Sequence, residues 1–192
     1  MGIRVVFLDF DGVLNHDVWF KKLSNHMDDP MTSRKPEHAF DPECAKRVDR
    51  LCNRCKAVIV VSSSWRYGRS VGELGRMLRA IGITAKVIDA TPMEIERDEA
   101  AKDYPPEILE VIPKARITLS ATRGREIAHW LEHTGFEVDG IVILDDDRDI
   151  APLQHRHVET SFHRGGFLEE HIEQAAALLV KPWPPKIEMV HA

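Results

Sequence analysis

The sequence predicts an α/β fold, in which a parallel sheet carries helices on both of its faces. Three short apolar runs support this prediction: Val5–Leu8, Ala57–Val61 and Ile141–Leu144. Runs of this length are typical of strands that are buried on both faces of a parallel sheet. The segments between the strands have helical patterns. Such alternation favours right-handed crossovers and is typical of a three-layer, Rossmann-like architecture.

The first half of the chain predicts three strands and two helices. A strand is expected at about Arg4–Asp9. A helix is expected from Asp41 to about Arg54, because Asp41-Pro42 is a typical pair of N-cap and first-turn residues. The elements that follow are a strand at Ala57–Val61, a helix at about Ser70–Ala80 that ends at Gly82, and a short strand at Ala85–Ile88.

The second half continues the alternation. Its expected elements are a helix that begins at about Arg123, strands at Ile141–Leu144 and His157–Thr160, and a helix at Leu168–Val180. Two polar inserts interrupt the pattern, at about residues 15–40 and, with a high charge density, at about residues 93–117. Neither insert is long enough for a large second domain, so we expect a single domain over residues 1–192 with a minimal flap or cap.

Composition agrees with a globular protein. Of the 192 residues, 43% are hydrophobic and 30% are charged, with a net charge of −5. A net negative charge disfavours a protein that binds nucleic acid over a broad basic surface. No apolar run approaches the ~20 residues of a membrane span, and the N-terminus lacks a signal-peptide pattern. Cys44, Cys52 and Cys55 are expected to be buried free thiols, and a cytoplasmic location is expected.

The first strand ends in two aspartates, Asp9 and Asp11, with one residue between them. The alternation of side chains sends both carboxylates to the same side of the backbone. Gly12 then lets the chain turn sharply. Because two such carboxylates repel each other at pH 7, one takes a proton or a divalent cation lies between them. Ligands of open α/β sheets bind at the carboxyl ends of the strands, so these aspartates are candidate catalytic residues.

The other buried strands also end in polar residues. Ser62 and Ser63 follow the strand at Ala57–Val61. The strand at Ile141–Leu144 is followed by residues 145–149, of which four are aspartates. So many carboxylates would repel one another without a cation, and hard oxygen ligands are those that Mg²⁺ prefers.

This order of motifs resembles the haloacid dehalogenase (HAD) superfamily, with its DxDG strand end, its strand-end serine and its strand-end acidic pair. The resemblance implies that Asp9 attacks phosphorus and forms an aspartyl-phosphate, while Asp11 protonates the leaving group and then activates water. It implies that Ser62, or alternatively Ser63, hydrogen-bonds a phosphoryl oxygen. The presence of Asp11 favours phosphoryl transfer over carbon–halogen chemistry. The resemblance also implies the strand order 5-4-1-2-3.

The resemblance further implies a Mg²⁺ site. Its ligands would be Asp9, Asp11 and the acidic pair, in which Asp146 is favoured as the direct ligand and Asp145 as a co-ligand or supporting residue. A basic residue at the start of a helix would contact the phosphoryl group. The candidates for this residue are Arg123 and, alternatively, Arg125. The expected substrate-binding residues are Gly12, Ser63, Arg66 and Arg125.

Three sequence blocks narrow the resemblance. The segments Val60–Arg66, Arg123–Leu131 and Ile143–Asp147 are similar to the SSSWR, RGxEIxxWL and ILDDD blocks of a HAD subgroup that occurs in nucleic-acid repair proteins. The implied function is a Mg²⁺-dependent phosphohydrolase with an open site, which would admit a nucleotide or a terminal phosphate of RNA or DNA. The alternatives are a small-metabolite or phosphoprotein phosphatase and a non-catalytic domain that binds a phosphorylated ligand.

Overall fold

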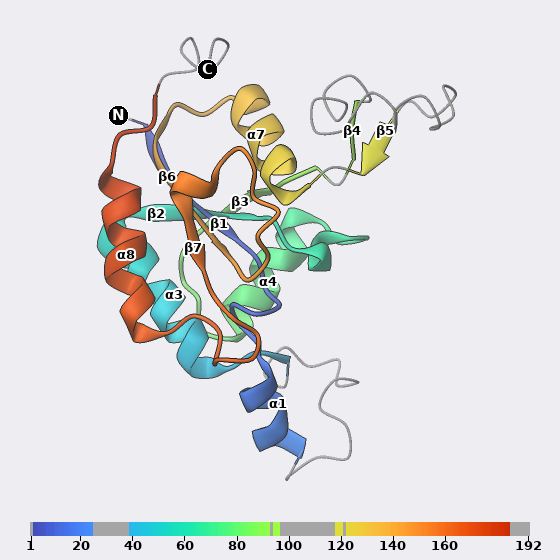
Figure 1. The fold of residues 1–192 in the computed structure, drawn as a ribbon, viewed down its shortest axis with the longest axis vertical. Coiled ribbons are helices and arrows are strands. Elements are labelled where there is room, and N and C mark those ends of the chain that lie inside the picture. Colours follow the sequence, from blue (N-terminus) through green and yellow to red (C-terminus); the bar gives the residue numbers. More distant parts are fainter. Residues whose placement is uncertain (1, 25–38, 93, 97–117, 121, 185–192) are drawn as a thin grey trace.

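The main sheet consists of five parallel strands (Figure 1). The computed structural model describes residues 2–24, 39–92, 94–96, 118–120 and 122–184. The strands are β1 (Ile3–Leu8), β2 (Ala57–Val61), β3 (Val87–Ala90), β6 (Val138–Asp145) and β7 (His157–Glu159). They lie in the order β3-β2-β1-β6-β7. This is the predicted order, so the expected three-layer, Rossmann-like topology is confirmed.

Strand β1 lies at the centre of the sheet, and its register aligns the ends of its two neighbours. Leu8 is opposite Val61 of β2 and Leu144 of β6. The following residues continue the alignment: the Asp9 N–H donates to the Leu144 carbonyl, and the Ser62 N–H donates to the Leu8 carbonyl, both at 3.0 Å. The residues that follow β1, β2 and β6 therefore meet at one place on the carboxyl edge of the sheet.

Helices cover both faces of the sheet (Figure 1). The described helices that pack on it are α3 (Pro42–Cys55), α4 (Val71–Ala80), α7 (Arg123–His133) and α8 (Glu169–Val180). Helices α3, α4 and α8 share one core with Val6 and Leu8 of β1, whereas α7 shares a second core with Val5 and Phe7. The alternating side chains of β1 thus pack into the cores on both faces of the sheet.

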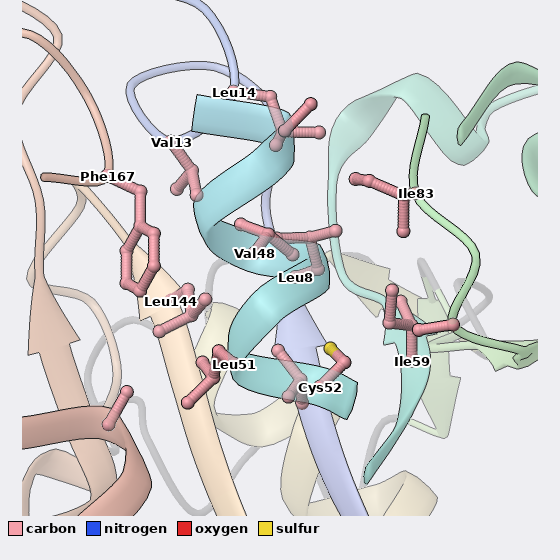
Figure 2. Close-up of a cluster of buried hydrophobic side chains, with 14 of the residues drawn as sticks. Leu8, Val13, Leu14, Val48, Leu51, Cys52, Ile59, Ile83, Leu144 and Phe167 are labelled. Atoms are coloured by element: carbon pink, nitrogen blue, oxygen red, sulfur yellow. The ribbon is translucent and has the colours of Figure 1, made fainter. Parts of the chain in front are cut away.

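The larger core holds α3 against the sheet. Val48 and Leu51 of α3 meet Leu8, Ile59 and Leu144, which come from three different strands (Figure 2). All five side chains are fully buried. Burial of such side chains stabilises the fold by about 1.5–3 kcal/mol each. Apolar packing therefore fixes the strands whose ends carry the polar residues.

Two predicted helix starts are confirmed. Asp41 is the N-cap of α3, where its side chain accepts the Glu43 N–H at 2.8 Å, and Pro42 lies in the first turn. Ser70 and Glu73 form a capping box at the start of α4. Caps of this kind contribute about 1 kcal/mol each. These starts were predictable because each cap uses residues that are close together in the sequence.

Two strands differ from their predicted bounds by more than one residue at an end, because strand-breaking residues interrupt their apolar patterns. Strand β3 extends past its expected end through Asp89, whose carboxylate accepts the Trp130 indole N–H at 2.7 Å. Strand β6 begins earlier than expected and includes Gly140, where a Cβ would lie 2.1 Å from the Leu179 carbonyl oxygen. Aspartate and glycine are both depleted in strands, so tertiary contacts outweigh local preference here.

The first insert, residues 15–40, was expected to be irregular but begins with helix α1 (Asp17–Ser24). The helix starts after His16, whose Nδ1 accepts the Trp19 N–H at 3.1 Å. Histidine is not one of the usual N-cap residues, so the start of this helix was not visible in the sequence. Residues 25–38 of this insert lie outside the described residues.

The charged insert, residues 93–117, is bordered by an antiparallel pair of strands that was not predicted. These strands are β4 (Glu94–Glu96) and β5 (Thr118–Ser120). Each is only three residues long, which is too short to give a periodic pattern in the sequence. Residues 97–117 lie outside the described residues.

The three cysteines, Cys44, Cys52 and Cys55, are free and buried, as predicted. Burial raises the pKa of the Cys44 thiol to about 11 and also raises the pKa values of the other two. Thiols of this kind are unreactive at neutral pH. Within the described part of the chain, no helix combines the length and the apolar character needed to cross a membrane.

Candidate active site

Three carboxylates meet at the carboxyl edge of the sheet. Asp9 follows β1, Asp145 ends β6 and Asp146 follows it, and each offers an oxygen within 4.8 Å of the others. Asp9 and Asp145 are buried, and Asp146 is half-buried. Gly12 permits this arrangement, because its φ is +72° and a Cβ there would lie 2.2 Å from Asp146 Oδ2. We call Asp9, Asp145 and Asp146 the carboxylate cluster.

Burial and repulsion change the acidity of the cluster. Burial raises the pKa of Asp9 to about 6, although the Arg123 guanidinium and a hydrogen bond from the Ser63 hydroxyl act in the opposite direction. Burial and the charge of Asp9 raise the pKa of Asp145 to about 7. Burial also raises the pKa of Asp146. Without a cation, the cluster therefore holds protons more tightly than exposed carboxylates do.

The residues of the cluster fit a magnesium ion. Hard carboxylate oxygens suit Mg²⁺, which takes few protein ligands because water and substrate oxygens complete its octahedron. Asp145 Oδ2 is buried without a hydrogen-bond partner among the described residues, and its ion-pair contact is with Arg123 Nε at 3.3 Å. An unsatisfied buried oxygen is expected where a ligand binds. Asp9, Asp145 and Asp146 are thus the residues that would hold the ion.

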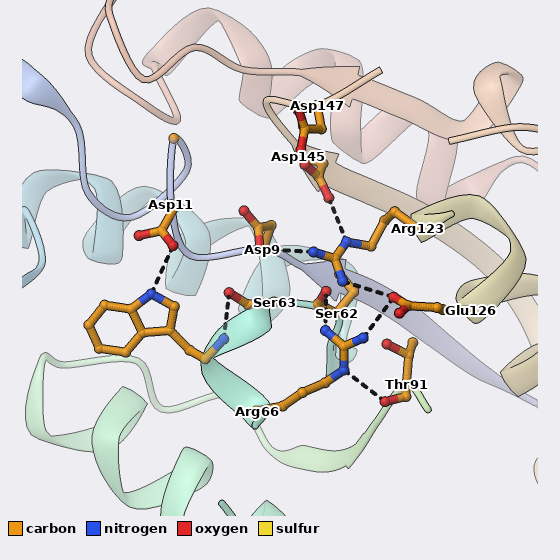
Figure 3. A network of polar contacts seen from close by, with 12 residues as sticks. Asp9, Asp11, Ser62, Ser63, Arg66, Thr91, Arg123, Glu126, Asp145 and Asp147 are labelled. Atoms are coloured by element: carbon orange, nitrogen blue, oxygen red, sulfur yellow. Dashed lines mark hydrogen bonds and ion pairs between the residues drawn. The ribbon is translucent and has the colours of Figure 1, made fainter. Parts of the chain in front are cut away.

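Asp11 was predicted to be a metal ligand, but its carboxylate does not join this cluster. Asn15 Nδ2 donates to Asp11 Oδ1 at 2.7 Å, and Trp65 Nε1 donates to Asp11 Oδ2 at 2.9 Å. These bonds turn the carboxylate toward the indole (Figure 3). The Gly12 N–H in turn donates to Asn15 Oδ1 at 3.2 Å. Asp11 is therefore held by two donors while Asp9 stays with the cluster.

The two serines after β2 lie close to Asp9 (Figure 3). The Ser63 hydroxyl acts on Asp9 by lowering the pKa of its carboxyl, and its oxygen accepts the Trp65 N–H at 3.4 Å in a short 3₁₀ turn at Ser64–Arg66. The Ser62 hydroxyl is buried and finds no hydrogen-bond partner in the described part of the chain. Both predicted serines thus lie at the site, where Ser62 has the unsatisfied hydroxyl.

Arg123 reaches the carboxylates from the first turn of α7. Its guanidinium lies 3.8 Å from Asp9 and 3.3 Å from Asp145, and its Nη1 donates to Glu126 at 2.9 Å. Burial opposes its charge, but these carboxylates outweigh burial and raise the pKa of Arg123. Of the two predicted arginines, Arg123 therefore makes the ion pairs with the cluster. The alternative, Arg125, is half-buried two positions further along the helix.

A buried carboxylate, Glu126, joins Arg123 to a second arginine. Arg66 Nη2 donates to Glu126 at 2.7 Å, and its other nitrogens donate to the carbonyls of Ser62 at 2.8 Å and Thr91 at 2.9 Å. Arg66 and Glu126 are each only 6% exposed. Arg66 was expected to bind substrate, but the structure commits its guanidinium to these protein acceptors. It supports Glu126, and through it Arg123.

The acidic loop fixes the start of α7. Thr122 is the N-cap residue but forms no side-chain cap hydrogen bond. Asp149 Oδ2 accepts the Arg123 N–H at 3.1 Å, and the Asp149 carbonyl accepts the Gly124 N–H at 3.0 Å. A Cβ on Gly124 would lie 2.1 Å from the Ala151 carbonyl oxygen. The loop that carries Asp145 and Asp146 thus also holds the helix that carries Arg123.

Three side chains of the site were not assigned to it from the sequence: Asn15, Trp65 and Glu126. Trp65 and Glu126 lie within the SSSWR and RGxEIxxWL blocks, which was the available signal for them. Asn15 gave no signal, because an asparagine at the end of a glycine turn is common in any loop. All three form hydrogen bonds with other side chains of the site, and motif spacing does not reveal such contacts.

Comparison with known proteins identifies the family. Over residues 5–172, the chain matches the family described as the HAD domain in Swiss Army Knife RNA repair proteins. No curated protein and no solved structure matches the chain. The matched range contains the carboxylate cluster, both serines and Arg123. A HAD domain implies phosphohydrolase activity on a phosphorylated substrate. The chain therefore belongs to the family of HAD domains that occur in Swiss Army Knife RNA repair proteins.

Proposed function

We propose that the protein is a Mg²⁺-dependent phosphohydrolase in which Asp9 attacks the phosphorus of a phosphate monoester. One observation carries the proposal: the buried Asp9 carboxylate shares the cluster with Asp145 and Asp146 and lies 3.8 Å from the Arg123 guanidinium. A carboxylate can attack an anionic phosphoryl group only where positive charge offsets the repulsion. A Mg²⁺ ion held by the cluster would supply such charge, and the Arg123 guanidinium supplies it independently.

The residues around Asp9 have distinct roles in this proposal. Asp9 forms an aspartyl-phosphate, and the leaving-group oxygen takes a proton from Asp11. Asp11 then accepts a proton from the water that hydrolyses the intermediate. Arg123 binds phosphoryl oxygens, and Ser62, or alternatively Ser63, donates a hydrogen bond to one of them. The Asn15 and Trp65 side chains each donate to one oxygen of Asp11 and so fix the orientation of its carboxyl group.

In the proposed enzyme, Asp9, Asp145 and Asp146 are the protein ligands of Mg²⁺. When bound there, Mg²⁺ would neutralise phosphoryl charge and orient the substrate for in-line attack. The raised pKa values of Asp9 and Asp145 support this assignment, because a bound cation favours the charged carboxylates that burial and mutual repulsion disfavour.

The proposed substrate is a nucleotide or the terminal phosphate of a nucleic acid. The family description supports it, since it names RNA repair proteins. A small-metabolite or phosphoprotein phosphatase is the alternative enzyme, and a non-catalytic domain for phosphorylated ligands is the alternative without chemistry. A cytoplasmic location is part of the proposal and is supported by the three free, buried cysteines.

The test is phosphate release from p-nitrophenyl phosphate, mononucleotides and 3′- and 5′-phosphorylated oligonucleotides, with Mg²⁺ and with EDTA. We expect Mg²⁺-dependent turnover that Asp9→Asn abolishes. Asp146→Asn should lower both turnover and the Mg²⁺-induced rise in Tm. Asp147→Asn is the matched control, because Asp147 is an exposed neighbour outside the cluster. Ligand binding without turnover on any member of the panel would favour the non-catalytic alternative.

A further inference from the structure

A cavity of about 870 Å³ opens beside Asp146, between α8 and the loop that joins it to β7. We call it the β7–α8 cavity. Its volume lies within the range of about 300–1,000 Å³ that small-molecule sites usually have. Asp146 belongs both to the carboxylate cluster and to the cavity wall. A molecule whose phosphate lies at the cluster therefore has this cavity next to it. The side chains that matter for its chemistry are Phe162, His163, Arg164, His171 and Gln174.

The permanent charges of the cavity nearly cancel. Arg148 pairs with Glu159 at 2.8 Å. The remaining arginine, Arg164, shares the wall with Asp146 and Glu170. A groove for several phosphates would carry an excess of positive charge. This balance instead favours an uncharged group that is attached to a single phosphate.

The cavity offers hydrogen-bonding groups to such a ligand. His171 Nδ1 accepts the Leu168 N–H at 3.0 Å, so the imidazole hydrogen is on Nε2. That Nε2–H has no partner within the described part of the chain, and the exposed Gln174 amide lies in the same wall. A donor, together with an amide that both donates and accepts, suits the hydroxyls of a sugar and the edge of a base.

The cavity also contains a fixed aromatic face. The half-buried Phe162 ring packs against Phe20 of α1, with 6.2 Å between the ring centroids, and the His163 ring stands nearly perpendicular to it, with 5.6 Å between centroids. Nucleic-acid bases stack on aromatic side chains irrespective of base identity. Of the groups commonly esterified to phosphate, a nucleoside uses both this face and the polar groups of the wall.

We propose that the β7–α8 cavity binds the nucleoside that carries the scissile phosphate. The substrate is then a nucleotide, either free or at the end of a strand. This inference rests on the proposed phosphohydrolase function, because that function places the phosphate at Asp9. Phe162 receives the base, while His171, Gln174 and Arg164 bond the sugar and the base edge. These residues determine specificity and take no part in the bond-breaking step.

The test is calorimetric binding to the Asp9→Asn protein in the presence of Mg²⁺. The probes are AMP, a 5′-phosphorylated and a 3′-phosphorylated hexaribonucleotide, and p-nitrophenyl phosphate. We expect at least one nucleotide probe to bind about tenfold more tightly than p-nitrophenyl phosphate. Phe162→Leu and Arg164→Ala should remove most of this difference. The matched controls are Phe136→Leu and Arg76→Ala, which alter exposed side chains outside the cavity.

Each outcome decides one of the two proposals. Equal affinity for nucleotides and p-nitrophenyl phosphate, or equal losses in Phe162→Leu and Phe136→Leu, would overturn the cavity assignment. Hydrolysis of p-nitrophenyl phosphate by the unmodified protein tests the phosphohydrolase function alone. Absence of all turnover, together with selective nucleotide binding, would overturn that function and retain the cavity. Tight binding of a strand end but not of AMP would support the cavity and identify the strand end as its ligand.

Discussion

The two sides of the carboxylate cluster are built in opposite ways. On the α7 side, Arg66 and Glu126 are buried and hydrogen-bonded to each other and to backbone carbonyls. On the β7–α8 side, the charged residues Arg148, Glu159 and Arg164 are exposed. The side chains of a buried network are restricted to one arrangement, because a buried charge without a partner destabilises the fold. Residues of an exposed wall can be substituted without unfolding the protein. The first side suits steps common to all substrates, and the second suits selection among them.

The largest effect that would test this comparison is expected at Glu126. Glu126→Leu removes the carboxylate that Arg66 and Arg123 share, and so leaves buried positive charge without its partner. We expect the free energy of unfolding in urea to fall by about 3–5 kcal/mol. Glu126→Gln, which retains an acceptor, should cost less. Glu132→Leu on the exposed face of the same helix is the control. A loss no greater than that of Glu132→Leu would mean that the α7 side is not held by its network.

An intermediate effect is expected from Mg²⁺ and pH. The pKa values of Asp9 and Asp145 are raised to about 6 and about 7, so the metal-free folded state holds protons that the unfolded state has released. The stability of the metal-free protein should therefore fall as pH rises from about 4 to about 7. Mg²⁺ replaces these protons, so it should raise Tm more at about pH 8 than at about pH 5.5, by several degrees.

The measurement is a thermal unfolding series at both pH values, with Mg²⁺ and with EDTA. Taking the difference between the two conditions at each pH cancels the titration of groups remote from the cluster. Asp147→Asn should retain the pH-dependent shift, and Asp146→Asn should lose most of it. An equal Mg²⁺ shift at the two pH values would contradict the assignment of Asp9 and Asp145 as metal ligands.

The smallest effect is expected on the open side. Arg148 pairs with Glu159 at 2.8 Å, but its side chain is 82% exposed. Exposed ion pairs contribute little to stability, so Arg148→Ala should leave Tm unchanged within the precision of a melting curve. A clear loss of Tm would show that the β7–α8 side is as tightly constrained as the α7 side, and the contrast between the two would fail.

Much of the fold was predictable, because a few local signals determine it. The three buried apolar runs and the alternation of strand and helix predicted a parallel sheet, and the resemblance to the HAD superfamily implied the observed strand order. The gathering of Asp9, Asp145 and Ser63 at one edge followed from the same reasoning, since each stands at the carboxyl end of a parallel strand. The helix that begins at Arg123 was located correctly, but the sequence left Arg123 and Arg125 as alternatives for the basic residue.

The remaining features depend on partners that are distant in the sequence. Arg66 and Glu126 lie 60 positions apart, and periodicity indicates that a residue is buried but not which charge it meets. Arg66 therefore looked like a substrate contact. In the same way, the DxD spacing brings Asp11 to the correct strand end, but the orientation of its carboxylate depends on Trp65, 54 positions away.

Gly12 has a consequence for how the site moves. At this residue the turn after β1 lies directly against the Asp146 carboxylate, with no side chain between them. Three residues earlier, directly after β1, the Asp9 N–H is bonded to the Leu144 carbonyl of β6. A displacement of either strand end therefore carries Asp9 and Asp146 together. The hydrogen bonds of the sheet therefore set the spacing of the two strand ends that carry these carboxylates.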